Sequence, residues 1–217
     1  MAPRSQLLLA LALATPIPAL AAQDGVSVGG FETHGSVGLD RGDYDALGRA
    51  MAALLSSRLG ERAAARVVAI APADTRRPGR VNIAAARDAA SRAGAKLLVV
   101  GSLLDQYGDI QLEARLIDAA TGEPLAVVRG DPAYLKREQL ALAVAALADQ
   151  LTAQPGVGGR PGSGGAGIPL DALLAFGRGL AAEADGNRAA AATAYRAAVQ
   201  AAPGFSEAQA ALRRVGG

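Results

Sequence analysis

Two carboxylates in the stretch 96–130, Glu113 and Asp118, are the nearest approach in this chain to a catalytic acid–base pair. Two carboxyl groups that share a pocket can act as general acid and general base. Glu113 lies on the polar side of an alternating segment, however, and Asp118 lies in a turn. A solvated strand face and a turn residue therefore account for both without catalysis.

A serine nucleophile finds little support in the sequence. Ser102 follows Gly101 but lacks the second glycine of a nucleophile elbow, and the only histidine, His34, is far away along the chain. We interpret His34 as an exposed residue of a glycine-containing loop.

Three aspartates close together could suggest a calcium site, but the loop lacks the glycine and the terminal glutamate of an EF-hand. Capping of a following helix explains them better, because carboxylates stabilise a helix N-terminus. The three are Asp40, Asp43 and Asp45, of which Asp43 is the expected N-cap. The sequence predicts no bound metal.

A glycine pattern and an arginine cluster are the remaining candidates. Gly162, Gly164 and Gly167 match the spacing of a dinucleotide-binding loop, but no strand precedes them and no acidic residue follows at the required distance. We therefore expect no cofactor. The cluster, which consists of Arg76, Arg77 and Arg80, is either a solvated loop or a contact for an anionic envelope polymer, lipid headgroups or an acidic partner.

Composition excludes several classes of function. The 217 residues include no Cys and no Trp, so the chain has no disulfide, thiol nucleophile or thiolate metal site. A single His leaves no zinc cluster of the usual kind. Net charge is only +2, which does not favour nucleic acid as a partner. Apolar residues make up 51% of the chain and aromatic residues only 3%, so we expect an aliphatic core.

The first 21 residues are typical of a secretory signal peptide. Arg4 provides a positive charge, an apolar run follows, and Ala19-Leu20-Ala21 forms a small-residue cleavage site. The apolar run is too short for a membrane span of about 20 residues, and no second long apolar stretch follows. We expect cleavage after Ala21, a mature chain without a transmembrane segment, and a periplasmic or otherwise exported location without a lipid-acceptor Cys.

Residues 22–154 predict an α/β domain in which helices pack on a mixed sheet that ends in an antiparallel three-strand meander. A continuous apolar run and an alternating segment give the first two strands of the meander, and Gly122 supplies a positive φ in its second turn. The expected strands are 26–31, 65–70, 96–104, 110–117 and 124–129, and the expected helices are 44–59, 82–93 and 134–153.

The stretches VSVGGFE, LGRAMAALLSSRL, AGAKLLVVGSLL and GDIQLEARLIDAATGEPL resemble the CsgG-like and TolB amino-terminal domain family over residues 26–153. The resemblance implies a bacterial envelope domain without catalytic activity. The curli-secretion members are lipoproteins with long membrane-inserting hairpins, whereas here Cys is absent and the turns at 105–109 and 118–123 are short. The family's pore activity is therefore not expected.

Residues 155–169 form a Gly/Pro-rich linker, and 170–217 predict a small all-α helical-repeat tail. Gly179, Ala191, Tyr195, Ala198 and Pro203 follow the spacing of a tetratricopeptide-like repeat. One such repeat cannot bury its own apolar faces, so we expect the tail to cover them against the sheet domain, another copy or a partner. The tail residues expected at a partner contact are Leu173, Leu174 and Tyr195.

Two hypotheses of function follow. The first is a non-enzymatic interaction or assembly protein of the bacterial cell envelope, active in secretion, surface-structure assembly or cell-wall regulation. Its partners would be envelope proteins, with a second copy of the chain as a further candidate. The alternative is an envelope hydrolase or ligand-binding enzyme with an unrecognised carboxylate site, which the scarcity of His and Cys disfavours. A pocket holding two facing carboxylates would favour it.

Overall fold

A computed structural model describes residues 25–35, 38–70, 76–77, 80–131, 133–162 and 167–216. The predicted signal peptide, 1–21, lies outside these ranges. Within them, no helix combines the length and apolar character that crossing a membrane requires.

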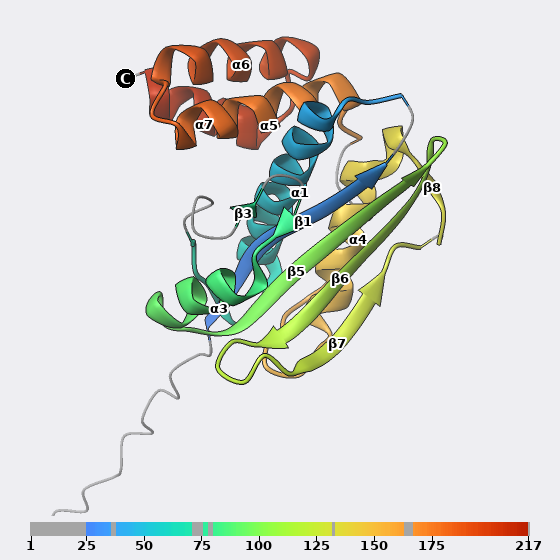
Figure 1. The fold of residues 1–217 in the computed structure, drawn as a ribbon, viewed down its shortest axis with the longest axis vertical. Helices are drawn as coiled ribbons and strands as arrows, with labels where there is room; N and C mark the ends of the chain where they lie inside the picture. Colours follow the sequence, from blue (N-terminus) through green and yellow to red (C-terminus); the bar gives the residue numbers. More distant parts are fainter. Residues whose placement is uncertain are drawn as a thin grey trace, which may run out of the picture.

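A mixed β-sheet forms the centre of the fold (Figure 1). Its strand order is β2-β1-β5-β6-β7, with the short β8 beside β6. β1 runs parallel to β2 and β5, whereas β5, β6 and β7 form an antiparallel meander. The strands are β1 (Gly25–Gly35), β2 (Arg66–Val67), β5 (Ala95–Gln106), β6 (Asp109–Asp118), β7 (Pro124–Arg129) and β8 (Leu135–Lys136), and a separate antiparallel pair is β3 (Arg76–Arg77) with β4 (Arg80–Val81). The expected α/β class is confirmed.

Helices pack on both faces of this sheet and at one end (Figure 1). Two of them, α1 and α4, share one apolar core with alternate side chains of the sheet, whereas α3 covers part of the opposite face. The helices are α1 (Arg41–Arg62), α3 (Ile83–Arg92), the 3-10 turn η1 (Arg137–Gln139), α4 (Leu140–Thr152), α5 (Leu170–Ala184), α6 (Arg188–Ala201) and α7 (Ser206–Gly216).

Alternation along β6 separates the core from the polar face as predicted. Ile110, Leu112, Ala114 and Leu116 are buried toward α1 and α4. The residues between them are partly exposed on the other face. A period of two residues places successive side chains on opposite faces, so the sequence pattern decides the register.

Gly122 has the backbone conformation expected of it. Gly122 has φ +80°, and a Cβ there would lie 2.6 Å from Nη1 of Arg87. Arg87 Nε donates to Ala119 O at 3.0 Å, so this guanidinium occupies the space beside the turn. In β1, the register of the pairing with β5 shifts between Val28 and Gly30, so this strand is irregular at Gly29.

Several predicted boundaries were wrong. The strand expected at 65–70 contains only the two residues of β2, and the helix expected from residue 134 begins at Leu140, after β8 and η1. α1 starts earlier than predicted, because Asp40 rather than Asp43 is the N-cap and accepts from Asp43 N at 2.7 Å. α1 also continues past the predicted end at residue 59, to Arg62. In contrast, α3 begins where the predicted helix 82–93 does, because Asn82 is its N-cap.

The tail helices pack against α1 rather than standing apart (Figure 1). Gly177 of α5 makes close packing possible, because a Cβ at this position would lie only 1.8 Å from Ala46 O. Arg178 pairs with Asp43, and Arg58 Nη2 lies 3.4 Å from Oε1 of Glu207 in α7. Sheet, α1, α4 and tail thus share one continuous core.

The first half of the Gly/Pro-rich segment is also tied to the sheet domain. Val157 is buried, and its carbonyl accepts from Ala65 N at 2.9 Å. Gly162 N donates to Asp149 Oδ1, which also accepts from Arg62 Nη1. Residues 155–162 therefore run along the C-terminal end of α1 instead of spanning a gap.

Candidate interaction surface

Part of the sheet face opposite α1 and α4 has no helix over it within the described ranges. α3 covers the end formed by Leu98, Val100 and Ile117. The other end presents polar side chains, which we call the open sheet face: Glu32, Ser102, Gln111, Glu113, Arg115 and Arg129. A hollow of about 420 Å³ lies over these residues.

Strand register places four of these side chains in one row. Glu32 of β1 pairs with Ser102 of β5, Ser102 with Glu113 of β6, and Glu113 with Arg129 of β7. Because neighbouring strands lie about 4.8 Å apart, the row crosses the sheet as a line of closely spaced polar groups. This juxtaposition depends on pairing between distant segments.

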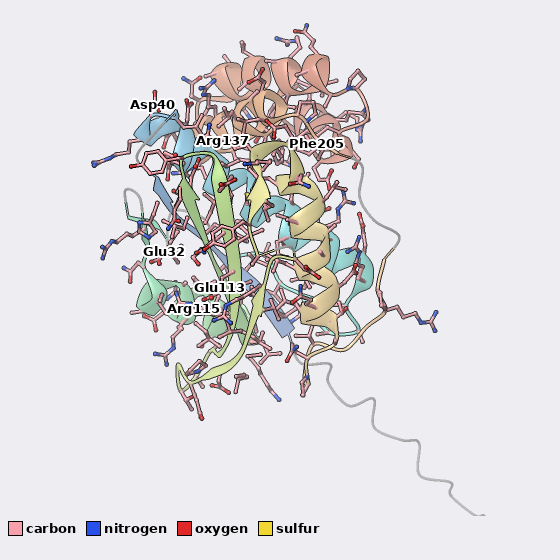
Figure 2. The ribbon with its side chains drawn as sticks, turned by 90° about the vertical axis from the view of Figure 1, so that its right-hand side faces the viewer. Glu32, Asp40, Glu113, Arg115, Arg137 and Phe205 are labelled. Atoms are coloured by element: carbon pink, nitrogen blue, oxygen red, sulfur yellow. The ribbon has the colours of Figure 1, made fainter. Side chains whose placement is uncertain are left out.

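Each carboxylate in the hollow has its own arginine. Glu113 Oε2 accepts from Arg129 Nε at 3.1 Å, and Arg115 Nη2 lies 4.0 Å from Glu32 Oε2. Figure 2 shows Glu32, Glu113 and Arg115 together on the side of the sheet away from α4. Both glutamates of the hollow therefore lie beside an arginine side chain.

A second, more polar hollow of about 630 Å³ lies at the end of the sheet, which we call the end cleft. It is bounded by the end of β1, the start of α1, β4 and the β5–β6 turn. Its walls are Thr33, His34, Gly35, Leu39, Arg41, Tyr44, Arg80, Leu104, Asp105, Gln106 and Tyr107. His34 and Leu104 line both hollows, so the end cleft and the open sheet face are continuous.

Asp105 anchors the wall of the end cleft. Its Oδ2 accepts from Tyr44 Oη at 3.0 Å and from Arg137 Nε at 2.9 Å, and its Oδ1 accepts from Gly108 N at 2.8 Å. Burial and the bond to Asp105 raise the pKa of Tyr44, and the same carboxylate raises the pKa of Arg137. This cluster joins α1, β5 and η1 around the cleft.

The other predicted chemical residues occupy structural positions. Asp118 is the last residue of β6, where the β6–β7 turn begins, and accepts from Thr121 N at 2.8 Å. This bond from the backbone is the main reason that the pKa of Asp118 is lowered. Asp45 pairs with Arg49, Asp43 with Arg178, and Asp40 caps α1. In the part of the chain that the structure describes, no group of three or more potential metal ligands occurs.

Of the predicted arginine cluster, Arg80 is exposed and lines the end cleft. Arg76 and Arg77 form β3, and their side chains lie outside the description. Sequence reasoning missed Arg41 and Tyr107, which line the same cleft. The signal for Tyr107 was the Tyr107-Gly108 pair in a hairpin turn, a position that usually carries Asn, Asp or Gly.

The prediction that three tail residues lie at a partner contact requires correction. Leu173 and Tyr195 are fully buried and Leu174 is 6% exposed, inside the core that the tail helices share with α1. The ring of Tyr195 packs within the tail, beside Phe176. Phe176 and Phe205 complete this packing, with ring centroids 4.8 Å apart. A partner could reach these side chains only if the tail helices separated from α1 or from one another.

No protein-family model matches the chain, and no curated protein sequence matches it. One similar solved structure is the LpoB C-terminal domain from Salmonella enterica, with a TM-score of 0.40 and 13% identity, covering 55% of this chain and 87% of that one. Another is TolB from Acinetobacter baumannii, with a TM-score of 0.32 and 11% identity, covering 59% of this chain and 27% of TolB. The CsgG-like and tetratricopeptide resemblances remain predictions, and the functional conclusion rests on the residues above.

Proposed function

We propose that this chain is an exported, non-enzymatic interaction protein of the bacterial cell envelope, and that it binds a partner protein through the open sheet face. The charged row from Glu32 to Arg129 carries this proposal. It lies on paired strands of the central sheet, so the backbone positions that carry these groups are fixed before any partner arrives. A surface that presents charges of both signs selects partners by electrostatic complementarity.

The sequence supports the cellular setting. The predicted signal peptide at 1–21 directs export, and the CsgG-like and TolB-like resemblance implies an envelope domain without catalytic activity. The processes that this resemblance implies are secretion, surface-structure assembly and regulation of cell-wall synthesis.

One observation bears on the alternative, an envelope hydrolase. The open sheet face does place Glu32 and Glu113 in a single hollow. Each glutamate, however, is paired with an arginine on a partly exposed surface, and such mixed-charge surfaces suit the binding of a charged partner.

Site-specific photocross-linking of the full chain in its bacterial envelope tests the proposal. A photoreactive residue replacing Gln111, on the open sheet face, should give a discrete adduct with one envelope protein. The same residue replacing the exposed Arg213 of α7 is the control and should not. Charge reversal by Arg115→Glu should remove the adduct. An adduct formed equally from both positions, or unaffected by Arg115→Glu, would contradict a partner site on this face.

A further inference from the structure

Two arginines line the end cleft. Arg41 is the first residue of α1 and Arg80 begins β4, so the fold brings them together from separate elements. Both residues are exposed. Among the described residues, neither guanidinium has an ion-pair partner, whereas Arg137 at the same cleft is bound to Asp105.

No exposed carboxylate lies among the described residues that line the cleft. Asp105 is the sole acidic residue among the described residues that line it, and its side chain is only 1% exposed. Tyr44 and Arg137 occupy its Oδ2, while Gly108 N occupies its Oδ1. The hollow therefore presents positive charge to whatever enters it.

Tyr107 provides the second, independent observation. It has φ +57°, and no other non-glycine residue in the described ranges has a positive φ. Its side chain is 84% exposed at the rim of the cleft. An aromatic residue is disfavoured in this conformation and gains little from packing there, and such strain concentrates at functional positions.

We propose that the end cleft binds an acidic segment of a partner protein, with Arg41 and Arg80 contacting its carboxylates and Tyr107 packing along it. Arginine matches carboxylate geometry through paired donors, and Tyr and Arg are the residues enriched at the centres of protein interfaces. The inference rests on the proposed function and names the chemistry of the partner. The concave shape suits a protruding chain better than a flat membrane. Proteins that bind anionic lipid surfaces use longer clusters of basic residues instead.

Binding of a capped hexaglutamate peptide to the full chain, measured by calorimetry, tests this assignment. Arg41→Gln combined with Arg80→Gln should weaken binding about tenfold or more, because two charge-assisted contacts are lost. The matched control is Arg160→Gln with Arg213→Gln, which removes the same charge from exposed positions elsewhere and should change binding by less than about twofold. Equal losses in the two double variants would overturn the site.

Tyr107→Asn separates binding from folding. Asparagine tolerates the positive φ, so this variant should raise the thermal unfolding temperature while it weakens peptide binding several-fold. Tyr134→Asn, at another exposed tyrosine, should leave peptide binding unchanged. Unchanged peptide binding by Tyr107→Asn would overturn the role of Tyr107.

Binding to vesicles that contain phosphatidylglycerol tests the competing assignment, a contact with the membrane. Vesicle binding that needs Arg41 and Arg80, without peptide binding, would overturn the acidic-segment assignment in favour of a membrane contact. Failure of peptide binding while the adduct at position 111 persists would refute only the cleft. Peptide binding without that adduct would refute the open sheet face and leave the cleft standing.

Discussion

Two clusters, each made of a tyrosine, a carboxylate and an arginine, lie in different parts of this protein, and they differ in burial. Around the end cleft, Tyr44 and Arg137 both donate to Asp105. In the tail, Tyr195 Oη donates to Glu183, which also accepts from Arg214 Nε at 2.8 Å. The Asp105 side chain is 1% exposed, whereas that of Glu183 is 28% exposed.

The connections they make also differ. In the first cluster, Asp105 is separated along the chain from Tyr44 by 61 positions and from Arg137 by 32 positions. This cluster therefore fixes the relative positions of α1, β5 and η1. The Glu183 cluster links α5 to α6 and α7 inside one small helical unit. Low exposure makes an unpartnered charge costly, so the first cluster should matter to the whole fold and the second mainly to the tail.

Asp105→Ala should have the largest effect. Removing this carboxylate leaves Arg137 and the Tyr44 hydroxyl without their shared acceptor in a mostly buried place, which should lower the free energy of unfolding by about 3–5 kcal/mol. Chemical denaturation followed by circular dichroism measures this. The control is Asp109→Ala, which removes an ion pair with Lys136 that is more than half exposed on both sides and should cost less than about 1 kcal/mol. Similar losses in the two variants would show that burial does not separate the two kinds of pair.

Gly177→Ala should have an intermediate effect and separate the two regions. The added Cβ would overlap Ala46 O, so α5 must move away from α1 at a cost of about 1–3 kcal/mol. Hydrogen exchange should then show faster exchange in α6 and α7 than in β5. Gly204→Ala, where a Cβ meets no atom within 4 Å, is the control and should leave exchange unchanged. Uniform loss of protection in sheet and tail would mean that the tail does not separate as a unit.

A pH titration should reveal the smallest effect. Hydrogen bonds from Arg214 are the main reason that the pKa of Glu183 lies below its usual 4.5. The lowered pKa means that the stabilisation is present above about pH 4.5 and is lost as pH falls through the folded-state value. Because solvent screens this partly exposed pair, the loss should be below about 1 kcal/mol.

Hydrogen exchange in α5 to α7 between pH 5 and pH 3 would measure this loss of stability in the tail. Glu183→Gln should flatten the pH dependence of the tail and leave that of the sheet unchanged. The same slope in the wild-type chain and in Glu183→Gln would disprove the assignment to this carboxylate.

Local patterns in the sequence were sufficient for the central elements. Alternation from Ile110 to Ile117 predicted which face of β6 is buried, Asn82 marked the start of α3, and Gly122 marked a turn with positive φ. Each signal depends on a few neighbouring residues and on the geometry of one strand, cap or turn. The sequence also identified Arg80 as a candidate contact, but not the residues that lie beside it.

Only the tertiary structure brought distant residues into one place. It joined Arg41, Arg80 and Tyr107 at one cleft, aligned Glu32 with Glu113 across the sheet, and buried Leu173 and Tyr195 against neighbouring helices. Strand order, register and helix docking depend on contacts between segments far apart in sequence, and composition or periodicity within one segment does not contain them. The apolar residues of the tail helices are an example. Their sequence requires that they be buried, but only the close approach of Gly177 to Ala46 in the tertiary structure shows that α1 is one of the elements that bury them.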